Sequence, residues 1–363
     1  MTLAATSSDP SVTADRRTRL REGLDDTDAL LVTHAVNVRY LTGFTGSSAS
    51  LLITADADVL RTDGRYVEQA AEQCPDVEVV LDRGDDWLAK RLDPGVRLGV
   101  EDHALPWARV RQLEAAVEGV VLEPAGACVE QLRQIKDSSE LAAIAQACRI
   151  TAETLTRVLA TIEPGTTERE LAARVEAGFR DAGAQDRAFA TIAAAGPNGA
   201  RPHHEPTDRA IAAGDLVTVD CGALVDGYAA DMTRTVAVGA PPAEQRLVEM
   251  HDAVRAAQTA GIEAIVPGAT AGDVDAATRS VLMDAGLEDA IAHPTGHGLG
   301  LEVHEQPILR SGGVATLQPG MAVTVEPGAY LPGVGGVRVE DTVAVTEVGA
   351  TVLTVATSEL PFR

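Results

Sequence analysis

The sequence is poor in basic residues, and this scarcity excludes two classes of partner. Only 30 lysines and arginines stand against 54 aspartates and glutamates, which gives a formal net charge of −24 over 363 residues. A field of this sign repels nucleic acids and anionic membranes. We therefore predict neither a nucleic-acid partner nor a membrane partner.

Long apolar runs and a secretory signal are also lacking. The chain contains no uncharged apolar stretch of about 18 residues, the length that indicates a transmembrane helix. The first fifteen residues lack the basic start and the apolar segment of a signal peptide. We expect residues 1–15 to form a disordered tail.

Cysteines are few, and no two of them form a CxxC pair. The four are Cys74, Cys128, Cys148 and Cys221. Such scattered positions are typical of buried thiols in a reducing compartment, so the sequence predicts a cytoplasmic protein. The phosphate-binding patterns GxGxxG and GxxxxGK[ST] are also absent.

The strongest feature that is present is an internal repeat. V-T-V-D-C-G-A at residues 217–223 recurs as V-T-V-E-P-G-A at residues 323–329, an offset of 106 residues. Upstream, P-G-T-T-E-R-E-L-A-A from residue 164 matches P-G-A-T-A-G-D-V-D-A-A from residue 267. Short repeats would suggest a solenoid. Two copies of about a hundred residues favour a pseudo-twofold α+β domain with its site where the halves meet.

The order of elements predicts two domains after the tail. Residues 16–132 alternate short apolar strands with helices, which indicates a small α/β domain. Its expected elements are strands at 29–33, 77–81 and 96–100, a hairpin of 49–54 with 58–62, and a helix at 66–74. Residues 133–363 form the second domain, in which Asp137 or Ser138 caps a long helix. Both halves of this domain read helix, helix, sheet.

Four repeated acids mark the candidate site. Asp220 and Glu326 are equivalent positions of the two copies, and each copy leads to a second acid, Asp231 or Glu340. Asp220 and Glu340 end alternating patterns typical of strands in a sheet core. Carboxylates that converge there without counter-charge would each be unfavourable by several kcal/mol, and a pair of divalent cations removes this cost.

Histidines gather in the same part of the chain. Six of the eight lie between His203 and His304. Any one of them, or any one strand acid, is more often a surface or structural group, but the set favours metal ligation. Carboxylates with one imidazole suit manganese, cobalt, iron or zinc in a two-metal site. Such a site generates a hydroxide near neutral pH and polarises a carbonyl, so the chemistry predicted is hydrolysis.

Several ordered motifs together carry a family resemblance. They are D-C-G-A-L-V-D-G-Y-A-A-D-M-T-R-T, G-H-G-L-G-L-E-V-H-E-Q-P, T-V-E-P-G-A-Y and G-G-V-R-V-E-D-T-V. With N-V-R-Y-L-T-G-F-T-G-S-S and R-T-D-G-R-Y-V-E-Q-A near the N-terminus, the chain from about Asp28 onward resembles the pita-bread metallopeptidases, in their Xaa-Pro aminopeptidase and prolidase branch. The resemblance implies a pita-bread catalytic domain after a smaller creatinase-type α/β domain, and a homodimer.

The resemblance also implies a metal-ligand set. Carried over position by position, the ligands are Asp220, Asp231, His297, Glu326 and Glu340, and none is missing. Asp231 and Glu340 would bridge two divalent ions. Mn²⁺ is the ion that we expect first, with Co²⁺, Zn²⁺ and Fe²⁺ as alternatives.

Further residues receive catalytic and substrate-binding roles from the same resemblance. Glu326 would take a proton from the bridging water. His304 would contact the scissile carbonyl and stabilise the tetrahedral intermediate. His203 matches a second histidine of the substrate pocket. The residues that match positions around the proline ring and the substrate carboxylate are His293, Tyr330 and Arg338.

Arg338 has two readings, which the sequence leaves open. It can bind a substrate carboxylate bidentately, which would favour the terminus of a dipeptide. It can instead orient Glu326 or Glu340 behind the metal ions. The pocket itself fits proline, because an Xaa-Pro amide has no N–H and a shaped pocket must replace that contact.

The sequence thus predicts a metal-dependent exopeptidase that cleaves the Xaa-Pro bond at the N-terminus of peptides with a metal-bridging hydroxide. Xaa-Pro dipeptidase activity is the alternative: the overall length suits a prolidase, whereas G-F-T-G-S and T-D-G-R-Y favour an aminopeptidase. A non-catalytic pita-bread protein that binds peptides or proteins is a more remote class. Such relatives typically lose ligands, and this chain keeps all five.

Overall fold

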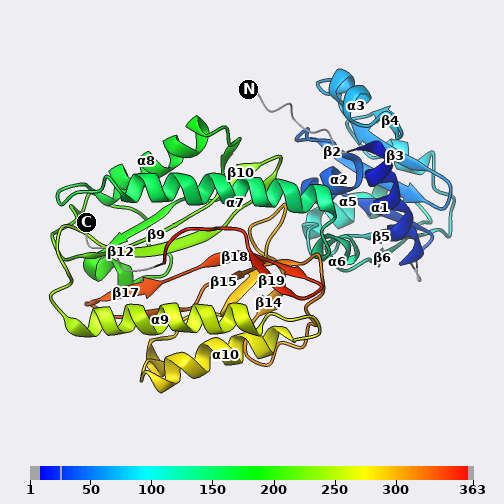
Figure 1. The fold of residues 1–363 in the computed structure, drawn as a ribbon. Helices are drawn as coiled ribbons and strands as arrows, with labels where there is room; N and C mark the ends of the chain where they lie inside the picture. Colours follow the sequence, from blue (N-terminus) through cyan, green and yellow to red (C-terminus); the bar gives the residue numbers. More distant parts are fainter. Residues whose placement is uncertain (1–8, 25–26, 359–363) are drawn as a thin grey trace. The chain divides into compact units, whose positions relative to one another are not determined.

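The computed structural model describes residues 9–24 and 27–358. The chain divides into two compact units between Arg133 and Gln134, and each unit is described by itself. Figure 1 shows the elements of both. Within the described residues, no helix is both long enough and apolar enough to cross a membrane.

The N-terminal unit contains a mixed sheet with helices packed on it. Its strands are β1 (Ala29–Val32), β2 (Ala49–Thr54), β3 (Asp58–Thr62), β4 (Glu78–Leu81), β5 (Arg97–Val100) and β6 (Val121–Pro124). Its helices are α1 (Pro10–Glu22), α2 (Ala35–Thr42), α3 (Val67–Gln73), α4 (Asp86–Ala89), α5 (Trp107–Ala116) and α6 (Cys128–Gln134). The strand order is β4-β3-β2-β1-β5-β6, with β1 antiparallel to β2 and parallel to β5.

The predicted strands, hairpin and helix of this unit are confirmed within a residue or so at their ends. β2 and β3 pair antiparallel as expected. Every residue of β1, A-L-L-V, is buried, which is why so short a run gave a clear signal.

The predicted tail extended too far into the chain. Residues 1–8 lie outside the described part, but α1 begins at Pro10, and Asp9 caps it by accepting from the Ser11 amide. The buried face of α1 is polar: Arg17 is buried and pairs with Asp58 at 2.7 Å. Because three of the four buried residues of α1 are polar, with Leu20 as the fourth, the helix gave no apolar periodicity to detect.

The second unit holds two helix pairs and several short sheets. The helices are α7 (Ser138–Leu159), α8 (Glu168–Asp181), α9 (Gln245–Ala264) and α10 (Ala271–Asp284). The strands of the first half are β7 (Asp186–Arg187), β8 (Ile192–Ala195), β9 (Leu216–Cys221), β10 (Ala223–Val225), β11 (Tyr228–Ala229) and β12 (Met232–Ala237). Those of the second half are β13 (Gly296–Gly298), β14 (Glu305–Leu309), β15 (Ala322–Val325), β16 (Gly328–Leu331), β17 (Gly335–Arg338), β18 (Asp341–Thr346) and β19 (Gly349–Val352).

The predicted repeat is visible in matching details of the two halves. Thr167 caps α8 in a capping box with Glu170, and Thr270 caps α10 in the same way with Asp273. The strands β12-β9-β8 follow one helix pair, and β14-β13-β15-β18-β19 follow the other. In Figure 1 the pair α7 and α8 lies on one side of the strands and the pair α9 and α10 on the other. The prediction of helix, helix, sheet in each half is confirmed.

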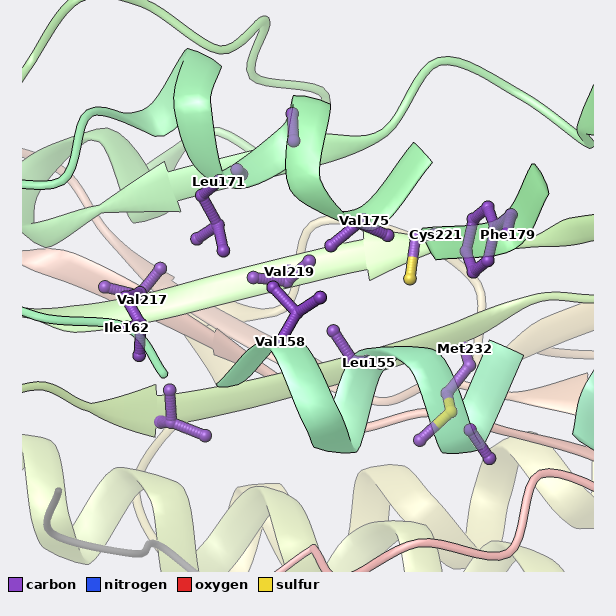
Figure 2. Packing of buried hydrophobic residues seen from close by; sticks show 14 of the residues in the cluster. Leu155, Val158, Ile162, Leu171, Val175, Phe179, Val217, Val219, Cys221 and Met232 are labelled. Atoms are coloured by element: carbon purple, nitrogen blue, oxygen red, sulfur yellow. The ribbon is translucent and has the colours of Figure 1, made fainter. Parts of the chain in front are cut away.

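The strands place apolar side chains on one face and the repeated acids on the other. In β9, Val217 and Val219 belong to one hydrophobic cluster with Leu155 and Val158 of α7 and with Val175 and Phe179 of α8, as Figure 2 shows. Asp220 alternates with them and so faces the opposite side. In β15, Val323 and Val325 belong to the core of the second half. This alternation turns the repeated acids toward a common interior.

Candidate metal centre

Pairing between strands brings the repeated acids together. β9 and β12 are antiparallel with Asp220 opposite Thr233, and Asp231 immediately precedes β12. β15 and β18 are antiparallel with Val325 opposite Asp341, so Glu326 and Glu340 emerge at the same end. The Glu340 amide donates to the Thr233 carbonyl at 3.1 Å, which joins the two halves.

Four of the five predicted ligands form a close cluster. Asp231, His297 and Glu340 each offer one donor atom, and these atoms lie within 4.8 Å of one another. His297 Nε2 lies 3.3 Å from Glu326 Oε1 and 3.7 Å from Asp231 Oδ2. The fifth, Asp220, lines the same cavity as Asp231, His297 and Glu326.

His297 is held with one ring nitrogen directed at the acids. Its Nδ1 lies 2.9 Å from the Gly298 carbonyl, which can only accept, so Nδ1 carries the hydrogen. The lone pair of Nε2 therefore faces Glu326 and Asp231. Burial lowers the pKa of His297 to about 4, which keeps the ring neutral near pH 7. A neutral, oriented imidazole is the form that binds a metal ion.

The carboxylates have oxygens without hydrogen-bond partners, which a bound cation would satisfy. Asp220 Oδ1, Asp231 Oδ1 and Glu340 Oε1 are buried and have no hydrogen-bond partner among residues 9–24 and 27–358. Burial, with the neighbouring carboxylates, raises the pKa of Asp231 and of Glu340 well above the usual range. Burial also raises the pKa of Glu326 to about 8. An all-oxygen and nitrogen donor set of this kind fits divalent metal ions.

Arg338 contacts the centre through Asp220. Its Nη2 donates to Asp220 Oδ2 at 2.6 Å and its Nε to Thr233 Oγ1 at 3.1 Å. The guanidinium is buried, and its charge holds one oxygen of Asp220 while leaving Oδ1 free. The sequence named Glu326 or Glu340 as the carboxylate that Arg338 would orient, whereas the carboxylate that it pairs with is Asp220.

Tyr330 and His293 continue this chain of hydrogen bonds. Arg338 Nη1 donates to the Tyr330 hydroxyl at 2.8 Å, and that hydroxyl lies 2.7 Å from His293 Nε2. His293 Nδ1 lies 2.8 Å from the Pro294 carbonyl and so carries the hydrogen, which makes Nε2 the acceptor from Tyr330. Burial, with the charge of Arg338, lowers the pKa of His293 to about 4. The neutral ring therefore fixes which group donates in each hydrogen bond from Arg338 through Tyr330 to His293.

A cavity of about 650 Å³ opens beside these groups. Among the predicted site residues, its lining includes Asp220, Asp231, His203, His293, His297, His304, Glu326 and Arg338. The His304 ring packs edge-on against the His297 ring, with their centroids 4.4 Å apart. Phe189, Val303 and Ile308 add an apolar part to the wall. Glu340 clusters with Asp231 and His297 of the lining, and Tyr330 is hydrogen-bonded to His293 of the lining.

Sequence reasoning missed the hydroxyls that support the ligands. Thr233 Oγ1 donates to Glu340 Oε2 at 2.6 Å. Thr324 Oγ1 accepts from the His297 amide at 3.0 Å. A signal existed for Thr324, because threonine is the central residue of V-T-V in both copies of the repeat. No pattern in the sequence marked Thr233, whose role depends on strand pairing across the two halves.

Comparison with known families decides what kind of site this is. Residues 142–347 match metallopeptidase family M24, and residues 16–135 match the creatinase/prolidase N-terminal domain. The chain belongs to metallopeptidase family M24. An uncharacterised peptidase of Bacillus subtilis, YqhT, is 40% identical over 338 residues, covering 92% of this chain and 95% of the relative.

Solved structures of similar proteins agree with this assignment. An Xaa-Pro dipeptidase from Bacillus anthracis has a TM-score of 0.93 at 37% identity and covers 97% of this chain and 100% of its own. An X-Pro aminopeptidase from Thermotoga maritima has a TM-score of 0.87 at 32% identity, with 95% and 100% covered. The M24 chain is thus a metal-dependent peptidase with a pita-bread catalytic domain, and the predicted family, fold and enzyme class are confirmed.

Proposed function

We propose that this M24 peptidase hydrolyses the bond between the N-terminal residue of a peptide and a proline that follows it. The observation that carries the proposal is the buried cluster around His297, with unpartnered carboxylate oxygens at the wall of the cavity. The names of its relatives, Xaa-Pro dipeptidase and X-Pro aminopeptidase, support the Xaa-Pro bond as the bond that is cleaved.

We propose that two divalent ions, Mn²⁺ before Co²⁺, Zn²⁺ or Fe²⁺, are bound in the cluster. The residues that would hold them are Asp220, Asp231, His297, Glu326 and Glu340. Oxygen and imidazole donors without a thiolate suit these metals. Bound ions of this kind lower the pKa of water and polarise a carbonyl.

The residues of the chain itself would position the substrate and move protons. Glu326 Oε1, 3.3 Å from His297 Nε2, would accept the proton of the attacking water. His304, beside His297 on the cavity wall, would donate to the oxygen of the scissile carbonyl. His203 also lines the cavity and would contact the substrate there.

The apolar part of the cavity would recognise the proline ring. Because the Xaa-Pro amide has no N–H, the enzyme cannot grip it by a hydrogen bond there, and shape has to supply the selectivity. Phe189, Val303 and Ile308 offer such a surface. His293 borders it and is fixed by its bond to Tyr330.

The geometry favours an aminopeptidase over a dipeptidase. Among the residues described, Arg338 is the only arginine or lysine that lines the cavity, and Asp220, Tyr330 and Thr233 already occupy its guanidinium. The free carboxylate of a dipeptide would therefore meet no unoccupied arginine or lysine among the described lining residues. Xaa-Pro dipeptidase activity is the second candidate, which the similarity to the Bacillus anthracis dipeptidase favours.

Peptides of matched sequence separate these candidates. We expect kcat/KM for Ala-Pro-Ala to exceed that for Ala-Pro by about tenfold or more, which is a difference of about 1.4 kcal/mol. Ala-Ala-Ala is the control, and its turnover should be far slower. Turnover of Ala-Pro alone would establish the dipeptidase. Equal turnover of all three peptides would overturn the proline specificity.

We further propose that the enzyme is a cytoplasmic homodimer. The compartment is supported by four cysteines that are all free, three of them buried. The dimer is supported by the family resemblance, and light scattering of the purified protein measures it. A monomeric mass at the concentrations at which the enzyme is active would contradict it.

A further inference from the structure

A second cavity, of about 450 Å³, is lined only by residues of the N-terminal unit. Its wall is polar. The hydroxyls of Thr33 and Ser50 and the guanidinium groups of Arg61, Arg83 and Arg109 contribute to it. The activity proposed above uses none of these residues.

The cavity lies at the carboxyl ends of two parallel strands. Thr33 follows β1 directly, and residues 104–106, which also line the cavity, follow β5. β1 pairs with β5 on one side, while the chain continues from β1 to β2 on its other side. The strand order therefore reverses between β1 and β5. In open α/β sheets, small ligands bind outside the carboxyl ends of the strands at this point.

Arg61 lines the cavity, and no hydrogen bond to its side chain is found within the described residues. It lies directly opposite Ser50 on neighbouring strands, so both side chains share one face of the sheet. Arg61 Nε is out of contact with water and has no hydrogen-bond partner in the part of the chain that the structure describes. Among the described residues, the Nη atoms of Arg61 also have no hydrogen-bond partner, and they are the donors that an acceptor in the cavity would meet.

The charges of the lining leave two guanidinium groups uncompensated. Both Nη atoms of Arg109 donate to the carboxylate of Asp85, so this pair is neutral. Within the described parts of the chain, neither Arg61 nor Arg83 forms an ion pair. Glu101, at the same sheet edge, already accepts from the amides of Thr33 and His34 at 2.6 and 2.7 Å. Two positive charges therefore face this cavity in a chain whose net charge is −24.

We propose that this cavity binds the phosphate group of a small molecule. Two guanidinium forks match the oxygens and the double charge of a phosphate monoester. The hydroxyl of Ser50 can donate to a remaining oxygen, whereas that of Thr33 already donates to Glu101 Oε2 at 3.2 Å. The volume is within the range of small-molecule sites and leaves room for an organic group beyond the phosphate.

Titration of inorganic phosphate into the metal-loaded, full-length enzyme tests the proposal. Trp107 is 74% exposed and adjoins Pro106, which lines the cavity, so its fluorescence reports occupancy. We expect saturable binding that weakens as KCl is added. Arg61→Gln should weaken it by about tenfold or more, because a bidentate charged contact is lost. Arg111→Gln, on an exposed residue paired with Glu114, removes the same charge elsewhere and should change nothing.

A second variant and a second anion complete the experiment. Arg83 is exposed, so Arg83→Gln tests the site even where the loss of Arg61 prevents folding. Succinate, a dicarboxylate, should bind more weakly than phosphate. No saturable binding of phosphate, or an unchanged affinity in both variants, would overturn the site. Tighter binding of succinate would overturn its assignment to phosphate. Peptidase activity in both variants, measured alongside, is expected to stay near that of the unaltered enzyme.

Discussion

Asp231 is the residue whose environment most clearly requires a cation. It is buried beside Glu340, Asp220 and Glu326, and one of its oxygens has no partner. Asp231→Asn removes a ligand charge, so we expect turnover to fall by about a thousandfold or more and bound metal to fall with it. The fold should persist, because the variant also removes like-charge repulsion from the metal-free protein. Metal analysis, kinetics and circular dichroism measure the three effects.

The matched control for Asp231 is an exposed aspartate of α9. Asp252→Asn makes the same chemical change on a surface residue that lies near Arg255 at 3.9 Å. This variant should keep both metal and activity. Near-normal activity of Asp231→Asn would contradict the role of Asp231 as a metal ligand.

Removal of the His304 side chain should lower the catalytic rate without the loss of bound metal that is expected for His297. His304 contacts the His297 ring and lines the cavity, but the cluster that could hold a metal ion comprises Asp231, His297 and Glu340. His304→Ala should therefore keep bound metal and reduce kcat by about 10²–10³, the usual effect of losing one donor to a developing oxyanion. Metal content and kcat are measured on the same sample. A loss of metal in proportion to the loss of rate would make His304 a ligand instead.

Single residues were predictable from the sequence where the repeat exposed them. Asp220 and Glu326 were found because each occupies the same place in its copy, and both lie at the cavity. The pairing of Arg338 with Asp220 could not be read in this way. Those residues are 118 positions apart, and only the packing of β17 against β9 brings them to 2.6 Å.

At the scale of elements, Glu168 fastens the start of α8 to the loop that carries His203. Its carboxylate accepts from the Ala195 amide at 2.8 Å, from His204 Nε2 at 2.9 Å, and from the amide and hydroxyl of Thr207. Burial alone would raise the pKa of Glu168, but these hydrogen bonds outweigh it and lower the pKa from 4.5 to about 2. The shift corresponds to about 3 kcal/mol of stability as an upper figure.

The sign of this shift sets a pH dependence. Because the folded-state pKa lies below the unfolded-state value, the stabilisation is complete above about pH 4.5 and is lost as pH falls toward 2. Glu168→Gln should therefore destabilise the protein at pH 7, and its difference from the parent should narrow below about pH 4.5. Urea unfolding of both proteins at several pH values from 7 downward measures this difference in the free energy of unfolding. Glu153→Gln, exposed on α7, should show almost no difference. A Glu168→Gln difference that is constant with pH would mean that hydrogen bonding through the ionised form is not the cause.

Elements with an apolar pattern were predicted well, and those with a polar buried face were not. β2 and β3 were placed to the residue because apolar runs are interrupted by a short polar turn. α7 was placed by its cap, since Asp137 accepts from the amides of Ser139 and Glu140. α1 was missed because most of its buried residues are polar, and the role of its arginines depends on acids and carbonyls elsewhere in the chain.

For the whole molecule, the repeat explains why one site draws on both halves. Each half supplies a strand ending in one acid and a second strand preceded by another, and the Glu340 amide bonds across to Thr233. Neither half alone has the full set of proposed ligands. We propose that residues 133–363 form this catalytic domain and that residues 16–132 form a domain of their own.

The central claim is that acids from both copies share bound metal, and an anomalous-scattering map of manganese-loaded crystals tests it most directly. The account predicts two peaks about 3.5–4 Å apart. Their contacts should be Asp220, Asp231, His297, Glu326 and Glu340. Peaks elsewhere, or these side chains pointing to separate places with His297 remote from them, would contradict it.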